Sequence, residues 1–130
     1  MLTLLPPLLG SSYQMFVPRA DRDGLDIAGI RQMQIRAPLG TSTGWNVRTP
    51  PWRGPDLCGL TGSFVPFART KTERLASCDP RRSLEERYKD HDGFVRAVEK
   101  AGRQLVNERF LLQIDADAFV AAAEASSVLR

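Results

Sequence analysis

The sequence predicts an α+β fold that is mainly α, because its two parts carry different structural signals. Residues 1–66 contain a hairpin turn signal and then a long stretch rich in glycine and proline with little periodicity. Residues 67–130 contain two helix-start motifs and apolar residues at helical spacing. We therefore expect an N-terminal β-hairpin and a long irregular loop in residues 1–66. A C-terminal helical hairpin follows in residues 67–130, and the two parts together form one partial domain.

The N-terminal hairpin is predicted from the dipeptide Asp23-Gly24. Aspartate followed by glycine is a strong turn signal because both central residues must accept a positive φ. Residues 13–17 are rich in aromatic and β-branched side chains, which is typical of a strand. A second strand over about 25–32 would pair back onto them.

Residues 34–66 form the predicted irregular loop. Glycines and prolines interrupt it, and neither a strand period nor a helix period emerges. Trp45, Trp52 and Phe64 lie in this loop and Phe67 follows it. Large aromatic side chains are normally buried, and few amphipathic elements are available here to bury them. We therefore expect the loop to pack against a larger body.

Two capping boxes predict helix starts at Thr70 and Ser83. In each, a glutamate follows the hydroxyl residue three positions later, as Glu73 and Glu86, so that each side chain satisfies a backbone N–H of the other. Pro80 ends the first helix because the residue before a proline avoids the α region. We expect a short helix over about 70–77 and a restart at Ser83.

Two further helices complete the predicted helical hairpin. The first runs over about 92–112 and carries an apolar stripe at helical spacing, formed by Phe94, Val98, Ala101 and Leu105. Asp115 or Asp117 is expected to cap the last helix, which extends to about Ser126. Its inward side chains would be Phe119, Val120 and Ala123.

Composition and charge argue against several classes of function. The net charge of +3 is mild, and the local basic run over 69–82 includes acidic residues and lacks interleaved aromatics, so we expect no nucleic-acid partner. Nothing approaches the roughly 18 apolar residues of a membrane span. The apolar segment 1–10 lacks the basic region of a signal peptide. We expect no membrane association and favour a cytoplasmic location.

No metal or cofactor is predicted. Asp21, Asp23 and Asp26 invite a calcium interpretation, but the ladder spacing and the distant bidentate glutamate of a calcium loop are missing. A polar turn is favoured. Cys58 and Cys78 lie too far apart for a Cys-x-x-Cys motif. We expect both cysteines to be ordinary thiols in a reducing compartment, and a disulfide between them is kept as an alternative.

One motif suggests catalysis. Gly40–Gly44 matches Gly-x-Ser-x-Gly around Ser42, and acidic residues and then His91 follow in the order of a Ser-Asp-His triad. The motif works where a strand enters and a helix leaves the serine, whereas Pro50-Pro51 stand soon after it and oppose a helix. His91 lies in a charged run where a solvated histidine is favoured. Ser42 and His91 are the candidates for nucleophile and base, and we favour no catalytic residue in this chain.

Several stretches resemble the far C-terminal part of a bacterial family of alpha/beta hydrolase domain proteins. The matching pieces are Asp23-Gly24, Ala28–Arg31, Pro38–Arg48, Gly62–Tyr88 and Glu124–Arg130, and the resemblance extends over about residues 5–130. It implies an alpha/beta-hydrolase-fold enzyme that acts on carboxylic esters, amides or lactones. It also implies that the nucleophile elbow and the catalytic histidine lie upstream of this chain.

Three hypotheses follow. The favoured one is the C-terminal covering segment of such a hydrolase, catalytically incomplete by itself. Its partner would be the catalytic body of the parent hydrolase or a second copy of the chain. The second hypothesis is a small autonomous binding or interaction module that uses the loop over 38–66. The third is a minimal hydrolase built on Ser42 and His91.

Overall fold

The structure, a computed structural model, describes residues 14, 16, 18–47, 57–58 and 62–130. Its elements in chain order are α1 (Met33–Arg36), β1 (Gly40–Thr43), β2 (Asn46–Val47), β3 (Leu57–Cys58), β4 (Ser63–Pro66), α2 (Lys71–Ala76), α3 (Leu84–Tyr88), α4 (His91–Asn107) and α5 (Gln113–Ala125). The predicted fold class, α+β and mainly α, is confirmed. In the described part of the chain, no helix is long and apolar enough to cross a membrane.

A turn does form at Asp23-Gly24, but of these two residues only Gly24 has the positive φ that was expected of both, and little sheet follows from it. The Gly24 N–H donates to the Asp21 carbonyl at 3.0 Å, and Gly24 has a φ of +75°, which favours glycine. The expected strand over 25–32 reduces to a single antiparallel bridge between Ala20 and Asp26. Most of the expected first strand, 13–17, lies outside the described residues.

The stretch expected to be an irregular loop contains two short antiparallel ladders. β1 pairs with β4 from Gly40 opposite Pro66 to Thr43 opposite Ser63, and β2 pairs with β3. Glycine is required at position 40, because an added Cβ would stand 2.6 Å from the Val65 carbonyl oxygen. At the other end of the ladder the hydroxyls of Thr43 and Ser63 lie 2.6 Å apart.

Both predicted capping boxes are confirmed. The N–H of Glu73 donates to the Thr70 hydroxyl at 3.1 Å, and the N–H of Glu86 donates to the Ser83 hydroxyl at 3.2 Å. In both cases the glutamate carboxylate accepts the cap's own N–H. These two boxes define the starts of α2 and α3, and α2 ends before Pro80 as expected.

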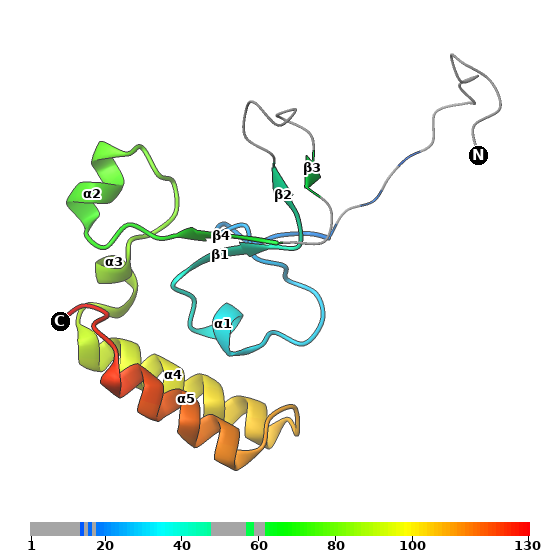
Figure 1. Cartoon of the computed structure of the whole chain (residues 1–130), viewed down its shortest axis with the longest axis vertical. Coiled ribbons are helices and arrows are strands. Elements are labelled where there is room, and N and C mark those ends of the chain that lie inside the picture. Colours follow the sequence, from blue (N-terminus) through cyan, green and yellow to red (C-terminus); the bar gives the residue numbers. More distant parts are fainter. Residues whose placement is uncertain (1–13, 15, 17, 48–56, 59–61) are drawn as a thin grey trace.

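The helices α4 and α5 pack side by side, and α1 lies between them and the β1–β4 ribbon (Figure 1). α4 ends at Asn107, earlier than predicted, because Arg109 adopts a left-handed φ of 63° and the chain turns there. The predicted caps of α5 are wrong. Its N-cap is Leu112, which makes no side-chain cap hydrogen bond, and Asp115 lies in the first turn. A carboxylate there is stabilised by the positive end of the helix dipole.

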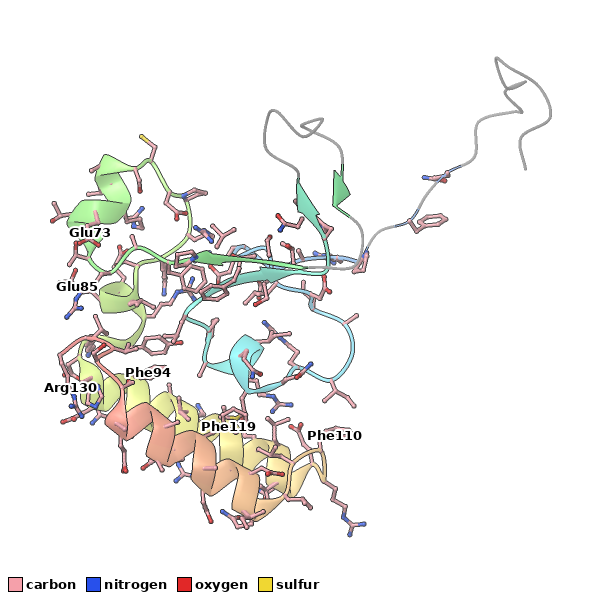
Figure 2. The ribbon with its side chains drawn as sticks, in the orientation of Figure 1. Glu73, Glu85, Phe94, Phe110, Phe119 and Arg130 are labelled. Carbon is pink, nitrogen blue, oxygen red and sulfur yellow. The ribbon has the colours of Figure 1, made fainter. Side chains whose placement is uncertain are left out.

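The core lies where α1, α3, α4 and α5 meet. Its buried residues are Met33, Ala37, Tyr88, Phe94, Val98, Ala101, Leu105 and Ala123. Tyr88 and Phe94 make an edge-to-face pair with ring centroids 5.3 Å apart, and the Tyr88 hydroxyl donates to the Pro38 carbonyl at 2.8 Å. Burial raises the pKa of Tyr88 to about 12. Phe119 lies on the part of the helical pair next to α1, and Phe94 lies nearer to α3 (Figure 2).

Candidate functional site

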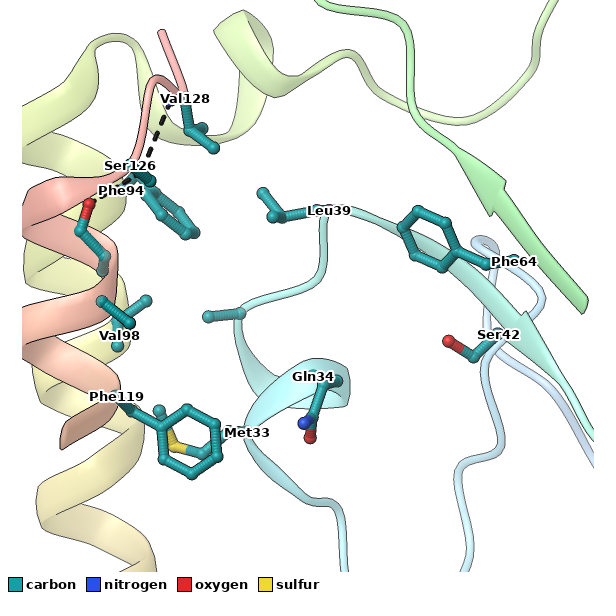
Figure 3. Close-up of a pocket in the computed structure, with 13 residues that line it drawn as sticks. Met33, Gln34, Leu39, Ser42, Phe64, Phe94, Val98, Phe119, Ser126 and Val128 are labelled. Atoms are coloured by element: carbon teal, nitrogen blue, oxygen red, sulfur yellow. Dashed lines mark hydrogen bonds between the residues drawn. The ribbon is translucent and has the colours of Figure 1, made fainter. Parts of the chain in front are cut away.

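An apolar hollow of about 390 Å³ opens between the β1–β4 ribbon, α1 and the α4–α5 pair (Figure 3). Its apolar walls are formed by Met33, Ala37, Leu39, Phe64, Phe94, Val98, Phe119, Ala122, Ala123 and Val128. α1 is only four residues long, so it covers part of the helical pair and leaves the hollow beside it. Cavities of this size and character are where small molecules usually bind.

Phe64 forms the edge of the hollow on the ribbon. Its ring lies against Gly40, where an added Cβ would stand 2.7 Å from the Phe64 Cζ atom. Phe64 remains 57% exposed and Trp45 is 55% exposed, whereas Phe67 is only 5% exposed. The expectation that the aromatics of this region need a larger body to bury them is therefore wrong for Phe67, which the chain itself buries. Phe64 and Trp45 are left open, and Trp52 lies outside the described residues.

Among the described residues, three polar side chains border the hollow: Gln34, Ser42 and Ser126. The Ser126 hydroxyl is already engaged, because it donates to the Ala123 carbonyl at 2.7 Å. The Gln34 amide and the Ser42 hydroxyl have no hydrogen-bond partner among the described residues. These two groups are free to bind something that enters the hollow.

The candidate nucleophile Ser42 does not lie on an elbow. It is the third residue of β1 and stands opposite Phe64 in an antiparallel ladder. The strand is followed by a bend and then by β2 rather than by a helix. A nucleophile elbow instead holds its serine on a sharp strand-to-helix turn.

The candidate base His91 is the first residue of α4 and lies beside the C-terminal tail. Its Nδ1 atom is 2.9 Å from the Val128 carbonyl oxygen, and its Nε2 atom is 3.4 Å from an Arg130 guanidinium nitrogen. The side chain is half-buried by these contacts, rather than fully solvated as expected. No hydrogen bond joins His91 to Ser42, and His91 does not border the hollow.

A second cluster, here called the polar junction, consists of Asp23, Thr41, Phe67, Arg81 and Arg87. The guanidinium groups of Arg87 and Arg81 lie 4.1 and 5.1 Å from the centre of the Phe67 ring, within the range of a cation–π contact. Arg87 pairs with the Asp23 carboxylate. Arg81 donates to the Thr41 hydroxyl at 2.9 Å. The junction joins the N-terminal turn, the ribbon and α3.

The acidic residues that suggested calcium are engaged by the chain itself. The Asp21 carboxylate accepts the N–H groups of Asp23 and Leu25 and pairs with Arg31. Burial opposes the charge of Asp21, but these hydrogen bonds and Arg31 hold its pKa below the usual value. Over the described residues, no group of three or more histidine, cysteine or acidic side chains could hold a metal ion.

Sequence reasoning missed the hollow, Gln34 and the arginine pair that encloses Phe67. The only signal was the set of aromatics without amphipathic partners, which includes Phe64 and Phe67. Cys78 is a free, exposed thiol. The side chain of Cys58 lies outside the described residues, so the expectation for that pair stays a prediction.

The model of a family described as an alpha/beta hydrolase domain matches residues 6–121. No curated protein and no solved structure matches the chain.

Proposed function

The chain belongs to the alpha/beta hydrolase domain family, and we propose that it forms the covering part of a hydrolase of this family. The substrates would be carboxylic esters, amides or lactones. The nucleophile and base would come from a catalytic body outside this chain. A second copy of the chain is the alternative partner.

The observation that carries this proposal is the position of Ser42. An oxyanion site needs the N–H after the nucleophile to face the reacting carbonyl, which the strained strand-to-helix turn arranges. Ser42 instead lies within an antiparallel strand. His91, the only histidine of the chain, is held at the tail by Val128 and has no orienting carboxylate among its hydrogen-bond partners. A triad base needs such a carboxylate or an equivalent.

The exposed aromatic side chains support the covering role. Phe64 is 57% exposed and Trp45 is 55% exposed, and large apolar side chains left open in this way are the kind of surface that a packed partner covers. The described residues contain two short antiparallel ladders, whereas the fold of these hydrolases places catalysis on a larger sheet with helices on both faces. The catalytic body would supply that sheet.

The first test is the activity of the purified chain. We expect no hydrolysis of short-chain aryl esters above the level of a Ser42→Ala, His91→Ala double variant. Saturable turnover that disappears in Ser42→Ala alone would overturn the proposal in favour of a minimal hydrolase.

The second test supplies the missing body. The polypeptide encoded immediately upstream is co-expressed with the chain, and we expect it to carry a strand–elbow–helix sequence. Esterase activity should require both polypeptides and should survive Ser42→Ala. An upstream sequence without an elbow would count against the covering role.

A binding module that uses residues 38–66 is the second candidate. The free Ser42 hydroxyl beside an apolar hollow favours it, because a binding site needs a polar group to orient its ligand. Ligand binding by the monomer, together with an upstream polypeptide that carries no elbow, would support this alternative.

A further inference from the structure

Among the residues that the structure describes, those that border the hollow are all uncharged. They are aliphatic, aromatic or neutral polar. A second cavity of about 660 Å³ that also borders α1 is different, because it is lined by Asp21, Asp23, Arg31, Arg36, Arg87 and Lys100 among others. Over the described part of the chain, charged side chains therefore line the second cavity and not the hollow. An ionic ligand would lose its hydration in the hollow without gaining a partner.

The two polar groups of the hollow that have no partner among the described residues lie on the same side of it. Gln34 of α1 and Ser42 of β1 stand across from the wall formed by Phe94, Val98 and Phe119 of the helical pair (Figure 3). Both Gln34 and Ser42 lack a hydrogen-bond partner among the described side chains and backbone groups. A hydroxyl and an amide can each donate and accept, so they fit a neutral head group of either kind.

We propose that the hollow binds an uncharged small molecule with an aliphatic or aromatic body and one hydrogen-bonding head group, such as an ester, an alcohol or an amide. The body packs against Phe94, Val98 and Phe119, and the head group meets Ser42 and Gln34. The idea that the hollow holds the substrate of a hydrolase rests on the proposed function. The binding of the small molecule itself does not, because it needs only residues of this chain. A carboxylate product would bind less well than the ester that yields it, because its charge has no partner there.

Decanol and decanoate form a matched pair of probes, since they share a chain and differ in the charge of the head group. Each is titrated into the full chain while backbone amide NMR signals are followed. We expect saturable shifts for decanol at Ser42, Val98 and Phe119, and affinity for decanoate that is weaker by about tenfold or more. Absence of decanol binding, or equal affinity for the two probes, would overturn the proposal.

Two tryptophan variants on α5 test the location. Ala122 and Ala118 are both exposed residues of this helix, but only Ala122 borders the hollow. Ala122→Trp should abolish decanol binding, and Ala118→Trp should leave it unchanged. Equal melting temperatures of the two variants show that each is folded. Equal effects on binding would move the ligand out of the hollow.

The head-group contacts are tested by Ser42→Ala combined with Gln34→Ala. This variant should weaken decanol binding by about threefold to tenfold, as expected for lost neutral hydrogen bonds, and unchanged affinity would contradict the assignment. The binding proposal and the proposed function can be contradicted independently of each other. An inactive chain that does not bind decanol removes the ligand class alone, and Ser42-dependent turnover removes the covering role whatever decanol does.

Discussion

Thr41 and Ser42 are neighbours in β1, yet they belong to two very different regions of the molecule. Successive side chains of a strand point to opposite faces. Thr41 is 8% exposed and enters the polar junction, where it donates to the Asp23 carbonyl and accepts from Arg81. Ser42 is exposed and enters the hollow without a partner among the described residues. One strand thus contributes a side chain to the buried polar junction and the next side chain to the exposed hollow.

The difference separates groups that hold the fold from groups that are available for function. In the polar junction the charged side chains are paired within the chain, because Asp23 pairs with Arg87, and Arg81 pairs with the neighbouring Asp79. A buried charge must be paired in this way. In the hollow, by contrast, Gln34 and Ser42 have no hydrogen-bond partner among the described residues and can bind a ligand. We expect substitutions in the junction to change stability and substitutions in the hollow to change binding.

The largest expected effect comes from breaking the polar junction. Arg87→Ala leaves the Asp23 carboxylate, whose side chain is 10% exposed, without its cation, and it removes the contact with Phe67. We expect the free energy of unfolding to fall by about 3 kcal/mol in urea denaturation. Arg103→Ala is the control, because its pair with Glu99 is exposed and 3.9 Å long. The control should cost about 0.5 kcal/mol or less, and an equal loss in both would contradict the burial of the junction.

The two capping boxes give the next effect. The Ser83 side chain is fully buried, and its hydroxyl accepts from the Glu86 N–H and donates to the Glu86 carboxylate. We expect Ser83→Ala to lower the free energy of unfolding by about 1–2 kcal/mol, and Thr70→Ala, in the exposed box, by about 0.5–1 kcal/mol. Thermal melts at a fixed pH compare the two. A larger loss of stability in Thr70→Ala would contradict the prediction that the buried box at Ser83 contributes more.

Acid should weaken the same box at Ser83. The backbone hydrogen bond from Ser83 and then the Arg74 guanidinium lower the pKa of Glu86 from 4.5 to about 2. Since the folded pKa is depressed, the contribution is present above pH 4.5 and is lost as the pH falls towards about 2. The difference in melting temperature between wild type and Glu86→Gln should shrink through that window. A difference that stays constant with pH would mean that the negative charge of Glu86 does not contribute to the stability of the fold.

Ser42→Ala should have the smallest effect on stability. Its hydroxyl is exposed and has no partner among the described residues, so we expect a change within about 0.5 kcal/mol. The neighbouring Thr41→Ala is the matched control and should cost about 1–2 kcal/mol, because it removes a buried hydroxyl with two partners. Equal losses in urea melts would remove the contrast between the two regions.

The local parts of this fold could be predicted from the sequence, because their causes lie within a few residues. The boxes at Thr70 and Ser83 each join positions three apart, and the turn at Gly24 needs only its own positive φ. The cap of α5 was mispredicted because Asp115 could serve either as a cap or as a first-turn charge. Sequence pattern does not distinguish these two roles.

The non-local parts could not be predicted in the same way. β1 and β4 lack an alternating apolar pattern, and they pair because Gly40 lets the backbone of β4 approach. The enclosure of Phe67 depends on Arg81 and Arg87 arriving from a later part of the chain. Of the candidate site, the motif identified Ser42 but not its surroundings, since the hollow exists only once α1 and the helical pair are placed.

The long sequence separations in the polar junction also have a consequence for the kinetics of folding. Arg87 meets Asp23 across 64 positions and Arg81 meets Thr41 across 40, whereas α4 and α5 are joined by a short connection. Contacts between distant positions require a large loop to close and generally slow folding. The helical pair is therefore expected to form before the junction. A contact that is absent from the transition state acts on the rate of unfolding. If the junction closes after the barrier, its contacts therefore determine how long the native state persists.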